Sequence, residues 1–361
     1  MSDTELIKND NKEPSTKSIG TKSREVLFFF IRIALALGLI YWIISKNEKA
    51  LIKALKSFDP VWLIPIFALY TIQLLGGAWK WLILLRVQHI RITFFEAFSL
   101  SMQGFFFSLF LPGGTLGGDV VKAAFIAKRA EKGKRLSGAF SILMDRILGM
   151  IALFSLAAVA ALLSYKFLLN VSGAMTVILG SLIFGCVAGL TATFVIFFHR
   201  TLEKIPLIKW ILNLVDRLTK GMVHKVMDVM DSFRTAWPSL LKNVLISLFT
   251  IHIVLALMAF FIAKGLHTPE VSKQIYVLGT TVPNAAGTLP ITPSGTGTRD
   301  FVMINIFASA FQQGSAKITS EDATGMGTAI ALIFTAVVLL FNILGGIFFV
   351  FDKFIAKDSK K

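Results

Sequence analysis

The sequence predicts an all-α integral membrane protein, built as a polytopic bundle of helices. Three observations lead to this fold class. Hydrophobic residues make up 55% of the 361 residues and charged residues 16%, whereas a soluble domain carries about 25% charged residues. The apolar residues gather in stretches that reach the roughly 20 residues needed to cross a bilayer. The net charge of +16 lies between these stretches, where basic residues face anionic lipids rather than nucleic acid.

The apolar stretches define the expected elements in chain order. Residues 1–24 are polar and lack the order of a cleavable signal, so we expect a disordered cytoplasmic tail. Six spans follow at about 25–45, 61–85, 136–164, 170–198, 244–264 and 326–351. Between the fourth and the fifth, 199–243 has the pattern of a basic amphipathic segment on the cytoplasmic leaflet. Residues 353–361 form a second polar tail.

Two further apolar segments, about 93–131 and 274–312, are each interrupted by a cluster of Pro, Gly and Thr. The first cluster runs from Pro112 to Asp119 and the second from Pro290 to Asp300. Such a cluster ends a helix, and the backbone groups that it frees cannot face lipid. We therefore expect each segment to form a re-entrant hairpin of two half-helices.

The distribution of basic residues agrees with two re-entrant hairpins. With both termini in the cytoplasm, 25 of the 37 Lys and Arg residues fall on the inner side and 8 on the outer side. This excess follows the positive-inside rule. We therefore expect a multi-pass protein of the cytoplasmic (inner) membrane, with its N- and C-termini in the cytoplasm.

The two interruptions share the pattern P-[GS]-G-T-x-x-x-D-x-V when Pro112 is aligned with Pro293. The same alignment pairs Asp119 with Asp300. Because the predicted topology gives the two halves opposite orientations, we predict two inverted repeats, 25–164 and 165–352. Many transporters use such repeats to build one midplane site that is reached from both sides. The alternative is a chance likeness between two breaks that are rich in Gly and Pro.

Ionisable residues at membrane depth are costly and are therefore candidates for function. Here they gather at the two interruptions and on the span after the first. The start of a half-helix offers backbone N–H groups, glycines let an oxygen approach, and threonines add hydroxyl donors, which together suit a phosphate. Arg146 or Arg299 would be its bidentate partner. The candidate substrate-binding residues are Gly114, Thr115, Gly117, Gly118, Asp119, Lys122, Asp145, Arg146, Gly295, Thr296, Gly297, Arg299 and Asp300.

The same residues have structural interpretations. Asp119 or Asp145 could pair with Arg146 or Arg299 and lock the two halves together without a ligand. Neighbours on a helix point about 100° apart, so we expect Asp145 and Arg146 to find their partners on different elements. Lys122 could lie at the cytoplasmic rim, where a lysine needs no functional explanation.

The sequence contains no signature of a cofactor, metal or nucleotide site. The run from Gly113 to Asp119 lacks the Lys-Ser/Thr ending of a phosphate-binding P-loop. The five histidines show no metal-ligand spacing, and the single cysteine, Cys186, excludes a disulfide within the chain. We expect no cofactor and no metal. Without an obvious nucleophile–base pair, we also expect the chain not to be an enzyme.

Three motifs resemble a known family. They are LPGGTLGGDVVKAAFIAKR at 111–129, SILMDRILG at 141–149 and LPITPSGTGTRDF at 289–301. Over nearly all of 25–352 the chain resembles the flippase-like lysylphosphatidylglycerol synthase transmembrane-region family, which includes the membrane part of the multiple peptide resistance factor. The resemblance implies movement of a lipid between leaflets, with 117–119, 145–146 and 295–299 lining the head-group path. Members of that family commonly carry Glu where this chain has the shorter Asp300.

Bifunctional members of that family carry a soluble aminoacyl-transferase domain after the membrane part, whereas this sequence ends at Lys361. We therefore expect it not to make an aminoacyl lipid. Many short members have no known substrate, so the resemblance does not assign lysyl-phosphatidylglycerol to this chain.

We predict a lipid flippase that moves a phosphate-bearing lipid, either a phospholipid or a polyprenyl-phosphate-linked lipid, across the cytoplasmic membrane. Arg146 and Arg299 would hold the phosphate, and Asp119 and Asp300 would balance those charges or bind a coupling proton. The alternatives are an integral-membrane enzyme that acts on a lipid head group and a scaffold for a lipid-modifying enzyme. The expected partners are membrane lipids and not nucleic acid. A homo-oligomer and a lipid-synthesising partner enzyme are left open.

Overall fold

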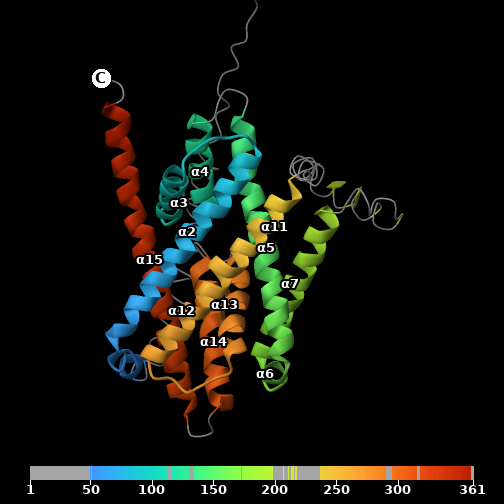
Figure 1. The fold of residues 1–361 in the computed structure, drawn as a ribbon. Helices are drawn as coiled ribbons and strands as arrows, with labels where there is room; N and C mark the ends of the chain where they lie inside the picture. The colour runs from blue at the N-terminus through green and yellow to red at the C-terminus, as the bar shows by residue number, and fades with distance from the viewer. Residues whose placement is uncertain are drawn as a thin grey trace, which may run out of the picture.

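The computed structural model describes residues 49, 51–111, 115–129, 134–171, 173–197, 236–289, 295–314 and 318–358, with single residues at 206, 210, 213, 214, 216 and 217. Every element assigned in these ranges is a helix (Figure 1). Five helical segments are long and apolar enough to cross a membrane, namely Pro60–Val87, Ser137–Leu163, Ala174–Phe194, Trp237–Gly265 and Ser320–Val350. The predicted all-α membrane fold is confirmed.

These segments match five of the six predicted spans. The remaining span, 25–45, and the tail 1–24 lie outside the described residues. The span predicted at 244–264 begins at Trp237 in the structure. Pro238 falls in the first turn of this helix, where a proline is tolerated. The end of the predicted amphipathic segment 199–243 therefore belongs to this span, and most of its remainder lies outside the described residues.

Four of the candidate spans are single helices and one is composite. The single helices are α2 (Leu63–Val87), α5 (Arg135–Leu163), α7 (Ala174–Phe197) and α15 (Ser320–Asp358). The composite joins α11 (Trp237–Ile246), a π-helical segment η2 (Ser247–Ile253) and α12 (Val254–Gly265). A 3-10 turn, η1 (Pro60–Trp62), leads into α2, and the short helix α6 (Tyr165–Leu169) follows α5.

Two pairs of shorter helices occupy the interrupted segments. The first pair is α3 (Phe94–Ser108) with α4 (Thr115–Arg129), and the second is α13 (Lys273–Gly287) with α14 (Thr296–Gly314). Three of these helices have 15 residues, or about 22 Å at 1.5 Å per residue, which is less than the roughly 30 Å of a bilayer core. The first pair lies in the upper half of Figure 1 and the second in the lower half. The re-entrant and inverted arrangement stays a prediction.

The helix α3 begins at a capping box. The backbone N–H of Glu96 donates to the hydroxyl of Thr93, and the carboxylate of Glu96 accepts from the backbone N–H of Thr93 at 2.8 Å. These bonds satisfy backbone donors that the first turn of a helix leaves unpaired. Glu96 therefore has a structural role at the entry of the first pair.

Glycines allow the two helices of each pair to approach closely. A Cβ added to Gly118 would lie 2.2 Å from the carbonyl oxygen of Gly104, and one added to Gly295 would lie 1.8 Å from that of Gly287. Gly295 also has a φ of +69°, which favours glycine. Backbone therefore meets backbone at both sites, and any larger residue would push the helices apart.

The two glycine contacts define a structural register between the pairs that differs from the motif alignment. Lys122 follows Gly118 by four residues, as Arg299 follows Gly295. Each cation has its Cβ near the first glycine of its pair, Lys122 beside Gly104 and Arg299 beside Gly287. The motif alignment instead placed Gly295 opposite Gly114, which lies outside the described residues. Helix contacts thus place Lys122 and Arg299 at corresponding positions.

The apolar core is divided between the two ends of the bundle. The main cluster contains residues of α12, α13, α14 and α15 around Met258, Phe307 and Phe334. A smaller cluster contains residues of α2, α3 and α4 around Trp81 and Leu100. By contrast, α7 buries little of its surface, and its Phe184 is 74% exposed. Apolar exposure along a whole helix is typical of a surface that faces lipid.

Replacing Gly118 by alanine tests the contact between α3 and α4. We expect Gly118→Ala to lower the free energy of unfolding by about 1–3 kcal/mol, because the new methyl overpacks the contact. Thermal unfolding of the detergent-solubilised protein measures the change. Gly185 on α7 is the matched control, since an added Cβ there meets nothing within 4 Å. Equal melting temperatures for both variants would contradict the close approach.

Candidate functional site

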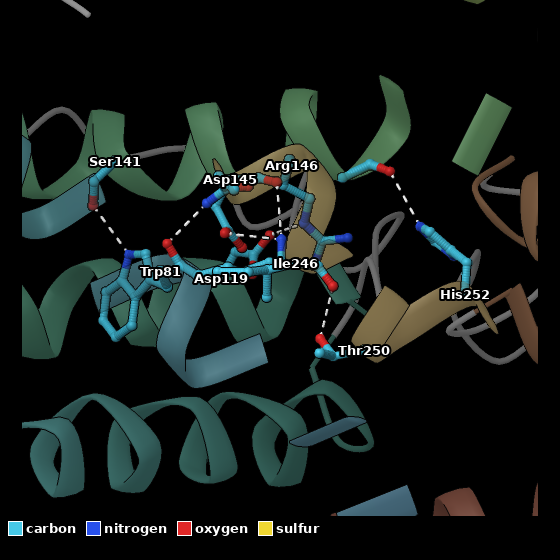
Figure 2. A network of polar contacts seen from close by, with 11 residues as sticks. Trp81, Asp119, Ser141, Asp145, Arg146, Ile246, Thr250 and His252 are labelled. Carbon is cyan, nitrogen blue, oxygen red and sulfur yellow. Dashed lines mark hydrogen bonds and ion pairs between the residues drawn. The ribbon is translucent and has the colours of Figure 1, made fainter. Parts of the chain in front are cut away.

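The candidate site is a cluster of charged side chains between α2, α4 and α5. The ammonium of Lys80 on α2 lies 2.9 Å from the Oδ1 of Asp145 on α5. The guanidinium of Arg146, the next residue on α5, donates through Nε to the Oδ2 of Asp119 on α4. Figure 2 shows Asp119, Asp145 and Arg146 together. We call Lys80, Asp119, Lys122, Asp145 and Arg146 the charged cluster.

Helix geometry explains why adjacent residues of α5 bind different helices. Asp145 and Arg146 point about 100° apart, so one reaches α2 and the other reaches α4. The expectation that they find partners on separate elements is confirmed. Two ion pairs therefore hold α5 against both neighbours, and both pairs lie within the first half of the chain.

Lys122 is the cation of the cluster that lacks a carboxylate in contact. Its side chain is buried, with the residue 8% exposed, so it does not lie at an exposed rim. Its Nζ sits 3.6 Å from the centre of the Trp81 ring. The indole is fixed in turn, because its N–H donates to the hydroxyl of Ser141 at 3.0 Å (Figure 2). Among the described residues, the ammonium of Lys122 has no hydrogen-bond acceptor.

The cluster carries more positive than negative charge. The groups that act electrostatically on Lys122 are Asp145, Asp119, Lys80 and Arg146. Three cations thus face two carboxylates, and the net charge of the cluster is positive. Because the two carboxylates are already engaged with Lys80 and Arg146, an added anion would find Lys122 available. This arrangement suits an anionic ligand such as a phosphate.

The second candidate group, on α14 and α15, is internally paired. Arg299 donates through Nε to the Oδ1 of Asp300 at 2.9 Å and through Nη2 to the hydroxyl of Thr335. That hydroxyl donates to the Oδ2 of Asp300 at 2.7 Å, which closes the triad. The guanidinium also lies 5.1 Å from the ring centre of Phe334. Arg299 and Asp300 are both buried, so this cation already has its counter-charge.

The other predicted site residues divide between these two groups. Gly117 and Gly118 are buried near the start of α4, ahead of Asp119, while Gly295 and Gly297 are buried at the start of α14 with Thr296 half-buried between them. Gly114 and the side chain of Thr115 lie outside the described residues. The structure therefore places the described residues of this set on two helix pairs, α3 with α4 and α13 with α14, and Lys122 belongs to the first pair.

Two members of the site were not among the predicted residues. Lys80 was readable as a cation inside an apolar span, but its partner depends on how α2 crosses α5. Its backbone carbonyl also accepts from the Nδ2 of Asn243 on α11 at 2.8 Å. The sequence did not indicate that Trp81 contacts Lys122, since a tryptophan in a span is usually only part of the core. Among the described residues, no group of three or more His, Cys, Asp or Glu is placed to hold a metal ion.

Comparison with known proteins identifies the family. The family model described as the lysylphosphatidylglycerol synthase TM region matches residues 29–346. A UPF0104 membrane protein of Pyrococcus horikoshii is 27% identical over 129 residues, which cover 36% of this chain and 37% of that protein. The match thus spans little more than a third of the length of this curated relative.

The pairing of Arg299 with Asp300 can be tested by removing one partner or both. We expect Arg299→Ala to lower the free energy of unfolding by about 3–5 kcal/mol, because it leaves a buried carboxylate without a cation. The double variant Arg299→Ala/Asp300→Ala should recover much of that loss in a thermal unfolding measurement. The exposed pair of Lys53 and Asp322, 3.0 Å apart, provides the control, and Lys53→Ala should change the melting temperature little. A double variant that is less stable than Arg299→Ala would contradict the pairing.

Proposed function

The chain belongs to the lysylphosphatidylglycerol synthase TM region family, and from this premise we propose that it moves a phosphate-bearing lipid between the leaflets of the cytoplasmic membrane. The lipid is a phospholipid or a polyprenyl-phosphate-linked lipid. One observation carries the proposal, namely the buried ammonium of Lys122 inside a cluster with excess positive charge. A lipid phosphate would supply the missing negative charge.

The physical obstacle to lipid translocation is the head group. A charged group in hydrocarbon costs several kcal/mol, while the acyl or prenyl tails can stay in the bilayer throughout. A protein that lowers this barrier needs a polar path at membrane depth with the opposite charge along it. The charged cluster has that character, because its helices α2 and α5 are candidate spans.

The cluster residues suit different parts of this task. Lys122 and Arg146 would contact the phosphate. Arg146 is the accessible member, with its side chain 38% exposed and that of its partner Asp119 24% exposed. Asp119 would balance Arg146 while the site is empty. The pair of Lys80 and Asp145 is more enclosed, at 7% and 16% side-chain exposure, so it would shape the cavity from behind.

We further propose that the two hairpins are inverted repeats that alternate in access. Two observations support this proposal. The hairpins lie in opposite halves of the bundle (Figure 1), and each carries a cation four residues after its close glycine contact. In the arrangement described here, Lys122 is available while Arg299 is closed off by Asp300 and Thr335. Rocking of one half against the other would exchange these roles, so that Arg299 receives the phosphate next.

A dithionite assay on liposomes tests translocation. Purified protein is reconstituted with fluorescently labelled phosphatidylglycerol, and we expect quenching to pass the half that the outer leaflet contributes. Lys122→Gln should slow this rate at least tenfold, because the amide cannot neutralise a phosphate. Lys128→Gln is the matched control, since Lys128 is an exposed lysine of the same helix.

The melting temperature separates a functional loss from a folding defect. Lys122→Gln removes a buried charge that lacks a carboxylate in contact, so we expect it to leave the protein as stable as before or to stabilise it. Loss of transport together with loss of stability would mean a structural role for Lys122. Equal rates in both variants would overturn the proposed phosphate contact, and a change in lipid mass would favour an enzyme.

A further inference from the structure

A buried histidine lies next to the charged cluster on the composite span. His252 belongs to the π-helical segment η2 and is 8% exposed. Its Nε2 lies 3.3 Å from the carbonyl oxygen of Gly149 on α5, and Figure 2 shows His252 beside the residues of the cluster that it labels. Its Nδ1 is buried and has no hydrogen-bond partner among the described residues. An imidazole inside an apolar span is a costly group that packing alone does not explain.

Gly149 connects this imidazole to the cluster. A Cβ added to Gly149 would lie 3.5 Å from the Nζ of Lys80, and Asp145, the partner of Lys80, precedes Gly149 by one helical turn. One glycine of α5 therefore has the ammonium of Lys80 beside its Cα and His252 at its carbonyl. Both groups therefore lie at the same residue of α5, close enough for the positive charge of Lys80 to act on a protonated imidazole.

Other orphaned polar atoms accompany His252. Asn243 Oδ1 and Ser247 Oγ on the same span and Gln73 Oε1 on α2 are buried and have no hydrogen-bond partner among the described residues. Such atoms are expensive in an apolar environment unless they are hydrated. Departures from the α-helical ladder, such as η2, are frequent at functional sites. The interface of α2 with the composite span thus offers polar groups beside the charged cluster, along which a proton could reach His252.

We propose that His252 takes up a proton when an anionic head group binds the charged cluster. This proposal rests on the proposed lipid function and adds its coupling to protons. Lys80 repels a protonated imidazole while the cluster carries excess positive charge. A phosphate placed among Lys80, Lys122 and Arg146 offsets that repulsion, so the protonated form becomes more favourable. By thermodynamic reciprocity, protonation strengthens the binding of the anion.

Of the charged groups on the surrounding helices, Lys80 is the one that acts electrostatically on His252. On α11, Lys242 is directed at the ring of Trp79. On α12, Lys264 pairs with Glu270 at 3.0 Å. On α13, Lys273 is the first residue and Tyr276 packs against Phe260. Lys80 is therefore the member of the charged cluster whose charge acts on the imidazole.

Calorimetry can count the protons. The full chain in detergent micelles is titrated with short-chain phosphatidylglycerol, whose phosphodiester does not itself titrate between pH 5 and 8. Repeating the titration in buffers of different ionisation enthalpy gives the protons taken up for each lipid bound. We expect uptake of a fraction of one proton, and an affinity that rises by up to about tenfold for each unit by which the pH falls, the limit for one coupled proton.

Two histidine variants make the test specific. His252→Gln keeps an N–H that can donate to Gly149 but cannot titrate, so proton uptake and the pH dependence of the affinity should both be lost. His267→Gln is the control, because His267 is a surface histidine whose Nδ1 lies 3.2 Å from the carbonyl of Ser57, and it should behave as the wild type. Binding without proton uptake, or uptake that persists in His252→Gln, overturns the coupling and leaves the lipid function standing. Absence of binding at every pH by both short-chain phosphatidylglycerol and a short-chain prenyl phosphate overturns both.

Discussion

A charge buried among apolar helices needs a partner, because the hydrocarbon of a bilayer supplies none. This constraint determines how the first half of the molecule is assembled. Asp145 and Arg146 lie next to each other on α5 and draw α2 and α4 to it from two directions through Lys80 and Asp119. The apolar contacts around Trp81 and Leu100 then fill the space between these helices. Gly104 and Gly118 let α3 and α4 approach closely, and α4 carries the Asp119 that pairs with Arg146.

The two hairpins satisfy the same constraint in different ways. In the second, Arg299 and Asp300 are consecutive residues near the start of α14, and Thr335 of α15 bridges them. In the first, Lys122 occupies the corresponding position but rests on an aromatic ring. A ring face attracts a cation less strongly than a carboxylate does. One hairpin is therefore electrostatically complete, while the other has capacity for an anion. A fully symmetric molecule would have two equal sites, and this difference is what an alternating-access mechanism would need.

Sequence patterns predicted the five spans that lie in the described residues, because about 20 consecutive apolar residues have few alternatives to crossing a membrane. They also predicted that Asp145 and Arg146 would bind different helices, since that follows from helix geometry alone. They could not identify Lys80 as the partner of Asp145, which depends on the crossing of α2 and α5. The burial of Lys122 depends on the face that α4 presents to α3. The π-helical segment that contains His252 packs against α2 and α5 and has no signature in local composition.

The free-energy cost of burying the Lys122 ammonium without a carboxylate in contact is the strongest argument that the charged cluster has a ligand. A structural role would be served better by an apolar residue of similar size, because replacement of buried charges by well-packed apolar groups is often neutral or stabilising. Gly149 lies between Lys80 and His252, since a Cβ added there would be 3.5 Å from the Nζ of Lys80 and its carbonyl oxygen contacts the imidazole. Lys122 has no carboxylate in contact, and the Nδ1 of His252 has no hydrogen-bond partner among the described residues. Both residues lie near the ion pair of Lys80 and Asp145. Packing explains neither, whereas an anion that arrives at the cluster together with a proton at His252 satisfies both.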